Sequence, residues 1–367
     1  MKVGMPKEIK NNEFRVGLTP SAVKELVTQG HEVMVEHNAG EAIGFTNELY
    51  QQAGAHVVET AEQIFNDAEM IVKVKEPQLN ECNMLREGQI LFTYLHLAPD
   101  PKQAEALMKS GCVAIAYETV TDAQGGLPLL APMSEVAGRL SIQAGARHLE
   151  KPQGGMGLLL GGVPGVASGS VVVIGGGVVG TNAIRMAIGM EANVTVLDKS
   201  IKRLQELDYQ FGPKLNTIYA SRGNMEDYIY QADLVVGAVL VAGDSAPKLI
   251  DRQMLTHMKK ASVIVDVAID QGGCCETSKP TTHEDPTYVV EGVTHYCVAN
   301  MPGAVPKTSS VALGNATLPY VLRMANHGYK EALRKDPHLL AGLNVHHGHI
   351  THQAVAQSLN KEYKPAK

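Results

Sequence analysis

A tract of 33 residues, from 152 to 184, carries no charged side chain, and it limits what this chain can form. A membrane-spanning helix needs ~20 mostly apolar residues, so the tract is long enough to be one. It also contains 11 glycines and Pro164, and in a helix interior a glycine costs ~1 kcal/mol and a proline ~3 kcal/mol relative to alanine. Residues 171–174 are β-branched and bounded by glycines, which is typical of a buried strand. We therefore expect a loop, a strand and a turn, and no membrane span.

The composition indicates which classes of protein and which partners can be excluded. The 367 residues favour two domains at ~150 residues each, and 44% hydrophobic residues are enough for ordinary buried cores. The net charge of −6, from 32 basic and 38 acidic residues, argues against nucleic acid or an anionic membrane surface as a partner. Five cysteines without a C-x-x-C pair and an N-terminus without a signal-peptide pattern predict a reduced, cytoplasmic protein.

Short apolar runs alternate with helical patterns along most of the chain, which indicates parallel strands joined by crossover helices. The pattern changes near residues 130 and 305, where prolines interrupt it. Long helices are expected at 134–150 and 308–327. The expected strands fall into two series, at 2–5, 32–36, 70–75, 89–94 and 113–117, and then at 171–174, 194–197, 234–236 and 263–267.

A G-x-G-x-x-G motif directly follows the expected strand at 171–174 and opens a helical stretch. Its glycines, Gly175, Gly177 and Gly180, suit a tight turn that approaches a pyrophosphate at a helix N-terminus. Asp198 ends the next strand, 18 residues after Gly180, close to the ~20-residue spacing of an acid that binds ribose hydroxyls. The motif predicts a dinucleotide site that prefers NAD, because Asp198 would repel the 2′-phosphate of NADP. The alternative is a structural turn in which Asp198 caps a helix.

Polar residues follow the carboxyl ends of other expected strands, where ligands bind in open α/β sheets. Arg15 suits a carboxylate, and Lys75 a carboxylate or carbonyl oxygen. His96 exchanges protons near neutral pH, and Asp270 can orient water or stabilise an iminium. Together these four side chains suit a 2-oxo or 2-amino acid. The alternatives are a solvated Arg15 and Lys75 and a hydrogen-bonded core histidine at His96, which lies between two leucines.

Several ordered runs resemble the alanine dehydrogenase branch of the alanine dehydrogenase and pyridine nucleotide transhydrogenase family. They extend over nearly the whole chain and include both of the family's signatures. The matching runs are residues 4–8, 12–16 and 19–20 in the first signature, 173–180 continuing to Asp198 in the second, and 161–166, 270–274 and 298–303.

The resemblance implies an α/β fold with two Rossmann-like, doubly wound parallel-sheet domains separated by a cleft. Residues 1–130 plus 306–367 would form a discontinuous substrate domain, and residues 131–305 an NAD-binding domain. The implied activity is reversible, NAD-dependent oxidative deamination of L-alanine to pyruvate and ammonia in a cytoplasmic homohexamer.

The family pattern also implies roles for individual residues. Arg15 and Lys75 would hold the substrate, and His96 and Asp270 would be the catalytic acid/base groups. The residues expected around NAD are Ser134, Gly175, Gly177, Val178, Val179, Gly180, Asp198, Arg203, Val239, Leu240, Val267, Ala268, Ile269, Lys279, Val298, Ala299, Asn300 and Met301.

Two other functions remain open at this point. One is an NAD-binding subunit of a proton-pumping transhydrogenase, which would involve no amino acid. The other is the same architecture acting on a different amino acid or imine. No metal site is expected, since the four histidines between 346 and 352 lack a paired cysteine or carboxylate pattern and are typical of a solvated tail.

Overall fold

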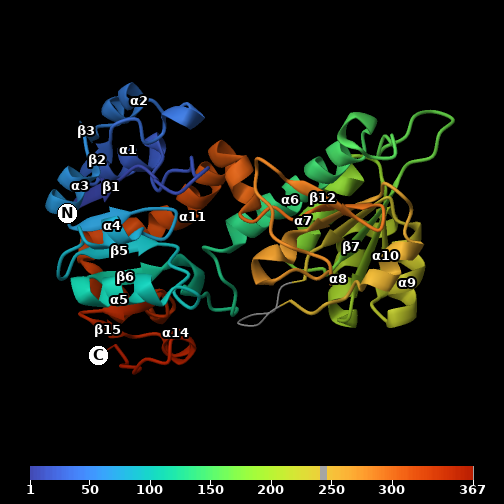
Figure 1. Cartoon of the computed structure of the whole chain (residues 1–367). Coiled ribbons are helices and arrows are strands. Elements are labelled where there is room, and N and C mark those ends of the chain that lie inside the picture. Colours follow the sequence, from blue (N-terminus) through green and yellow to red (C-terminus); the bar gives the residue numbers. More distant parts are fainter. Residues whose placement is uncertain (240–245, 367) are drawn as a thin grey trace. The chain divides into compact units, whose positions relative to one another are not determined.

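The computed structural model describes residues 1–239 and 246–366 of the chain. The chain divides into two compact units (Figure 1). The first unit combines Met1–Met133 with Val305–Lys367, and the second is Ser134–Ala304. Figure 1 shows the blue N-terminal strands and the red C-terminal ones in the same unit, so the two ends of the chain contribute to one sheet.

An eight-stranded sheet forms the centre of the first unit, in the order β15-β14-β6-β5-β4-β1-β2-β3. The six strands from β1 to β6 are parallel, and the expected runs at 2–5, 32–36, 70–75, 89–94 and 113–117 all contain strands. These strands are β1 (Lys2–Met5), β2 (Glu32–Glu36), β3 (His56–Val58), β4 (Met70–Val72), β5 (Ile90–Thr93) and β6 (Val113–Ala116). The helices are α1 (Pro20–Thr28), α2 (Asn47–Gln52), α3 (Ala61–Asp67), α4 (Leu79–Cys82), α5 (Pro101–Ser110), α11 (Pro306–His327), α12 (Tyr329–Lys335), α13 (Pro337–Leu340) and α14 (Gln353–Ser358).

The histidine-rich segment is not a tail but part of the sheet of the first unit, although its four histidine side chains are exposed or partly exposed, as expected. Strands β14 (Leu343–His346) and β15 (His349–Ile350) form an antiparallel hairpin there, and β14 pairs with β6. The two loop residues, His347 and Gly348, have φ of 45° and 84°, as a tight hairpin turn with both central residues left-handed requires. Val345 and Ile350 are buried in the core of the first unit, and this apolar contact holds a short, polar hairpin in place.

The second unit has a seven-stranded sheet in the order β12-β13-β11-β10-β7-β8-β9, parallel except for β12. Every residue of β10 and β11 is buried, as expected where helices cover both faces of a parallel sheet. The strands are β7 (Ser170–Ile174), β8 (Asn193–Asp198), β9 (Leu215–Tyr219), β10 (Leu234–Gly237), β11 (Val263–Asp266), β12 (Thr287–Val290) and β13 (Val293–Tyr296). The main helices are α6 (Ala131–His148), which begins in the first unit, α7 (Val178–Gly189), α8 (Ile201–Phe211), α9 (Arg222–Gln231) and α10 (Arg252–His257).

Both units are Rossmann-like α/β folds, which confirms the predicted fold class. The charge-free tract forms a loop, strand β7, a glycine turn and the start of α7, as its glycine content predicted. Across the described ranges, 1–239 and 246–366, no helix combines the length and apolar character needed to cross a membrane.

Candidate functional site

The three motif glycines lie where β7 passes into α7, and Gly175 and Gly180 are required for different reasons. Gly175 has φ of 97°, a left-handed conformation that L side chains rarely adopt. A Cβ on Gly180 would lie 1.8 Å from the carbonyl oxygen of Gly175, so only glycine lets the helix pack this closely on the turn. A Cβ on Gly177 would meet no atom within 4 Å, so the space beside this residue is open.

Asp198 and Arg203 fix the backbone of the turn. The Asp198 carboxylate accepts the Gly176 N–H through Oδ2 at 2.7 Å and the Ser200 N–H through Oδ1 at 2.8 Å. Arg203 Nε donates to the Gly176 carbonyl oxygen at 2.7 Å, and its Nη2 to Thr181 Oγ1 at 2.7 Å. Asp198 therefore acts on the turn itself, and a carboxylate oxygen has lone pairs for further hydrogen bonds to ribose hydroxyls.

The residues present fit a dinucleotide. Helix α7 has 12 residues and starts at Val178, with Gly177 as its N-cap, so no side chain caps the N-terminal N–H groups. Such a helix end attracts phosphate charge. Val178, the first helical residue, is 46% exposed, whereas Val179 behind it is 9% exposed and packs inward. Open space at Gly177 and an uncapped helix N-terminus form the cradle that a pyrophosphate needs.

The other residues expected around NAD mostly follow the carboxyl ends of neighbouring strands. Val239 follows β10, and its side chain lies 3.1 Å from the position of a Cβ on Gly175. Val267, Ala268 and Ile269 begin the 3₁₀ helix η5 (Val267–Gln271) directly after β11, and exposed Asp270 belongs to the same turn. Val298, Ala299, Asn300 and Met301 follow β13 and lead into η6 (Met301–Ala304).

Three expected residues lie elsewhere or outside the described part. Ser134 is half-buried in the first turn of α6. Lys279 lies on the segment before β12, where its Nζ is 4.6 Å from the centre of the Tyr288 ring and its N–H donates to the Tyr288 hydroxyl at 2.8 Å. Leu240 lies outside the described residues.

In the first unit, Lys75 lies three residues beyond β4, beside a buried group of charges. Lys73 is 0% exposed, and its Nζ lies 3.1 Å from Glu8 Oε2 and 2.7 Å from Glu81 Oε1. Burial acts to lower the pKa of Lys73, but both carboxylates outweigh it and raise the pKa, so Lys73 stays charged. Glu8 Oε1 also accepts the N–H groups of Val74 and Lys75, at 2.7 and 3.3 Å. Glu8 thereby fixes the backbone that presents Lys75.

Arg15 is 3% exposed and its guanidinium makes two parallel hydrogen bonds to the Glu13 carboxylate, at 2.7 and 2.6 Å. Burial raises the pKa of Glu13, but the hydrogen bond and charge of Arg15 outweigh it and hold the pKa below its usual value. Arg15 is thus not a solvated loop residue. Its guanidinium plane is set by Glu13, and Nη1 also approaches Met133 Sδ at 3.2 Å.

His96 lies beyond β5, and its side chain is exposed, so the alternative of a core histidine is wrong. Its backbone has φ of 48°, and its ring stacks on Tyr94 with centroids 5.9 Å apart and planes at 12°. Burial raises the pKa of the Tyr94 hydroxyl, which donates to the Leu129 carbonyl oxygen at 2.6 Å. The Glu118 carboxylate accepts the His96 backbone N–H at 2.6 Å.

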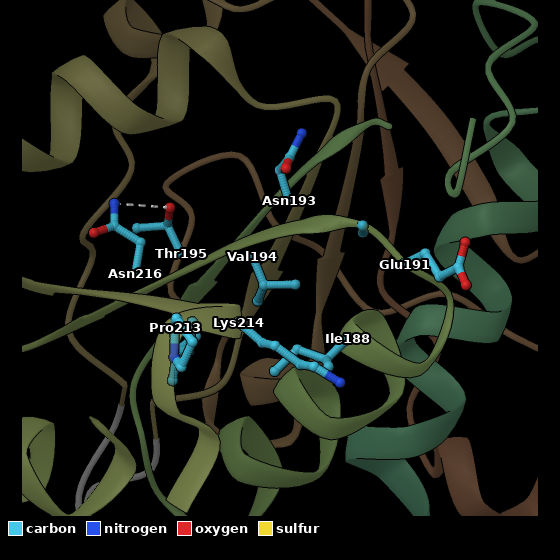
Figure 2. A pocket seen from close by; sticks show the side chains of 10 residues that line it. Ile188, Glu191, Asn193, Val194, Thr195, Pro213, Lys214 and Asn216 are labelled. Atoms are coloured by element: carbon cyan, nitrogen blue, oxygen red, sulfur yellow. Dashed lines mark hydrogen bonds between the residues drawn. The ribbon is translucent and has the colours of Figure 1, made fainter. Parts of the chain in front are cut away.

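Figure 2 shows a pocket of about 690 Å³ in the second unit, at a different place from these residues. It lies at the amino ends of β8 and β9, whereas the glycine turn and Asp198 lie at carboxyl ends. None of the expected site residues lines it. Within residues 1–239 and 246–366, no group of three His, Cys, Asp or Glu side chains is arranged to hold a metal ion.

Comparison with known proteins gives matches along nearly the whole chain. The family models described as "Alanine dehydrogenase/PNT, N-terminal domain" and "Alanine dehydrogenase/PNT, C-terminal domain" match residues 4–137 and 141–353. The chain belongs to the alanine dehydrogenase/PNT family. This confirms the resemblance seen in the sequence.

Two relatives in this family are especially similar. An alanine dehydrogenase of Halomonas elongata is 57% identical over 366 residues, which cover 100% of this chain and 99% of that protein. A solved structure of an L-alanine dehydrogenase is 52% identical, with a TM-score of 0.96 over 98% of this chain and 99% of that one. A transhydrogenase of Sinorhizobium meliloti shares the fold, with a TM-score of 0.83 at 24% identity over 96% of this chain and 100% of that one.

Sequence reasoning missed the carboxylates that support the family's signature residues. Glu8 is within the first signature and Glu13 two residues before Arg15, but their buried partners are visible only in the structure. Lys73 is the one residue whose position in the sequence indicates a buried carboxylate. It lies inside the apolar run Ile71-Val72-Lys73-Val74, where a lysine needs a buried counter-charge. No sequence feature connects Glu118 with His96, which lies 22 residues before it.

Proposed function

We propose that this protein is an NAD-dependent L-alanine dehydrogenase, which converts L-alanine, NAD and water reversibly to pyruvate, ammonia and NADH. The observation that carries the proposal is the 57% identity to an alanine dehydrogenase over the full length of both chains. The glycine turn supports it independently, since its open cradle suits a dinucleotide.

NAD is assigned to the turn between β7 and α7 in the second unit. The uncapped N-terminus of α7 would hold the pyrophosphate, and Asp198 the adenosine ribose. Preference for NAD over NADP follows because the Asp198 carboxylate repels a 2′-phosphate. When bound, NAD accepts the hydride from the α-carbon of alanine.

Arg15 and Lys75 are assigned to the substrate. Glu13 holds the Arg15 guanidinium in one plane, which suits recognition of a planar carboxylate. Lys75 is 15% exposed in its side chain, and Glu8 fixes its backbone. A compact ammonium group at this place can neutralise carboxylate charge or polarise the carbonyl oxygen of pyruvate.

His96 and Asp270 are assigned as the acid/base groups, and both side chains are exposed. His96 takes a proton from the water that adds to the iminium carbon and returns it to the amino group. As ammonia leaves, the remaining hydroxyl proton passes to His96 and the carbonyl group of pyruvate forms. Asp270 stabilises the positively charged iminium and orients that water. Proton transfer by a placed side chain contributes ~10²–10⁴ in rate.

The proposal includes a homohexamer in the cytoplasm. All five cysteines are free and buried, which suits a reducing compartment. Light scattering of the purified protein tests the assembly, with a mass of six 39.3 kDa chains expected.

The deciding experiment measures NADH formation from a panel of L-amino acids, with NADP in parallel. We expect L-alanine and NAD to be preferred and His96→Ala to lower kcat by at least ~100-fold while NAD binding is retained. A different preferred amino acid would keep the architecture but change the substrate. Hydride exchange between nucleotides without any amino-acid activity would favour the transhydrogenase function instead.

A further inference from the structure

Glu118 receives two consecutive backbone N–H groups at the end of β5. Its Oε1 accepts the His96 N–H at 2.6 Å, and the Leu95 N–H lies 3.1 and 3.2 Å from its two oxygens. Glu118 belongs to the 3₁₀ helix η2 (Tyr117–Thr119), which follows β6. Because β6 pairs with β5 as far as Ala116 opposite Thr93, the sheet brings this carboxylate to the residue that follows the neighbouring strand.

The backbone of His96 needs such support. Its φ of 48° is left-handed, a conformation that costs energy for any residue with a Cβ and persists only where surrounding contacts enforce it. Hydrogen bonds from two consecutive backbone N–H groups to one side chain oppose a change of φ at His96, and Oε1 alone lies within reach of both, at 2.6 and 3.1 Å. The bonds from Leu95 and His96 to Glu118 supply that enforcement.

The direction of the His96 ring depends on this backbone. Within the described part of the chain, the ring nitrogens make no hydrogen bond, and the ring's ordered contact is its stack on Tyr94. The Tyr94 ring is itself fixed by its hydroxyl bond to Leu129. If His96 relaxed to an ordinary negative φ, its Cβ would turn away from the Tyr94 face and carry the ring with it.

We propose that Glu118 is a positioning residue, which holds His96 in its left-handed backbone conformation and so aims the imidazole at the substrate. The inference rests on the proposed role of His96 in the reaction. Glu118 acts through the backbone of His96, and its carboxylate contacts neither substrate nor cofactor.

Three substitutions of Glu118 test this role at one fixed pH, with L-alanine and NAD. Glu118→Ala removes the acceptor, and we expect kcat to fall by ~100-fold, as for a catalytic group misplaced by about 1 Å, with KM for L-alanine and NAD affinity changed less than about threefold. Glu118→Gln retains one oxygen for the His96 N–H and is expected to keep kcat within about threefold of wild type. Glu118→Asp withdraws the carboxylate by one methylene and should be intermediate.

The comparison of Glu118→Gln with Glu118→Ala separates positioning from charge. Glu118 lies near His352, where burial lowers the pKa of the imidazole and the Glu118 charge acts in the opposite direction. Glu118→Gln removes that charge as completely as Glu118→Ala does. Retained activity in the glutamine variant therefore supports positioning, and an equal loss in both variants overturns it.

A double-mutant cycle gives the second readout. In the His96→Ala background, Glu118→Ala should cause no further loss of kcat, because the imidazole that it positions is absent. Losses that multiply would overturn the proposal, as would near-normal kcat in Glu118→Ala alone. If Glu118→Ala fails to fold, the same cycle is run with Glu118→Asp.

A matched control and the wild type separate this proposal from the proposed function. Glu69 is an exposed carboxylate of the same unit that accepts the Lys2 backbone N–H at 2.7 Å, and Glu69→Ala should leave all kinetic constants unchanged. Wild type without alanine activity, or His96→Ala with normal kcat, refutes the function itself. An active wild type with an impaired His96→Ala and an unimpaired Glu118→Ala refutes only the positioning role.

Discussion

In the first unit, Lys75 and His96 each follow a strand, and a carboxylate accepts hydrogen bonds from the backbone at that point. In the second unit, the turn between β7 and α7 depends on glycines, because a Cβ would not fit there. Glu8 and Glu118 each accept two consecutive backbone N–H groups. Gly175 and Gly180 instead admit a backbone path that a Cβ would block. Asp198 and Arg203 also bind the turn in the second unit, but its path additionally requires positions without a Cβ. We therefore expect the first unit to be most sensitive to the loss of a carboxylate, and the turn to be sensitive to an added Cβ as well.

The largest effect is expected at Glu13, a buried carboxylate whose ion-pair partner, Arg15, is itself a candidate substrate-binding residue. Glu13→Gln leaves the Arg15 guanidinium, 3% exposed, without its carboxylate, and removing one partner of a buried pair costs about 3 kcal/mol or more. Urea unfolding at pH 7 measures the loss, with Glu41→Gln, at an exposed position, as the control.

The pH dependence of that loss identifies charge as its cause. The folded-state pKa of Glu13 is held below the ordinary 4.5, so its ionisation contributes stability above about pH 4.5 that is lost as the pH falls through the folded pKa. The stability difference between wild type and Glu13→Gln should therefore shrink in acid. An equal difference at pH 7 and pH 3.5 would contradict a charge-based role for Glu13.

In the turn of the second unit, we expect an added Cβ to disturb the structure by steric overlap. Gly180→Ala places a Cβ 1.8 Å from the Gly175 carbonyl oxygen, and overpacking against backbone costs about 1–3 kcal/mol. We expect the turn to shift and NAD to bind about 100-fold more weakly, a change of about 2.7 kcal/mol. Calorimetric titration with NAD at pH 6 and pH 8 should give the same fold-change. Gly189→Ala, also in α7 but with no atom within 4 Å of the added Cβ, is the control, and weakening of equal size there would refute a local steric cause.

The elements of the site that follow local rules could be predicted from the sequence, and those that depend on distant partners could not. Strand β7, the glycine turn and Asp198 lie within 30 residues and follow from β-propensity and spacing. Likewise, β4 and β5 were recognisable as apolar runs followed by polar residues. Their local pattern was sufficient because packing in a parallel sheet requires it.

Lys73 shows why the parts of the site that depend on distant residues could not be predicted from the sequence. Its burial depends on Glu8, 65 residues away in the sequence, and on Glu81, and no periodicity connects the three. The left-handed backbone at His96 and the β14–β15 hairpin have the same origin, since Glu118 and β6 stabilise them from distant parts of the chain. Charge partners and register across a sheet are properties of the folded state.

The smallest effect is expected at Gly177, and it gives the most selective test of the cradle. A Cβ there meets no atom within 4 Å and its φ is −66°, so Gly177→Ala should change the free energy of unfolding by less than about 0.5 kcal/mol. The added methyl group nevertheless points into the space assigned to the pyrophosphate. We expect NAD affinity to fall about tenfold, or 1.4 kcal/mol, with KM for L-alanine unchanged. Gly223→Ala in α9, where a Cβ is equally unobstructed, should change neither quantity. Unaltered NAD binding in Gly177→Ala would mean that the open space beside this glycine is not where the dinucleotide lies.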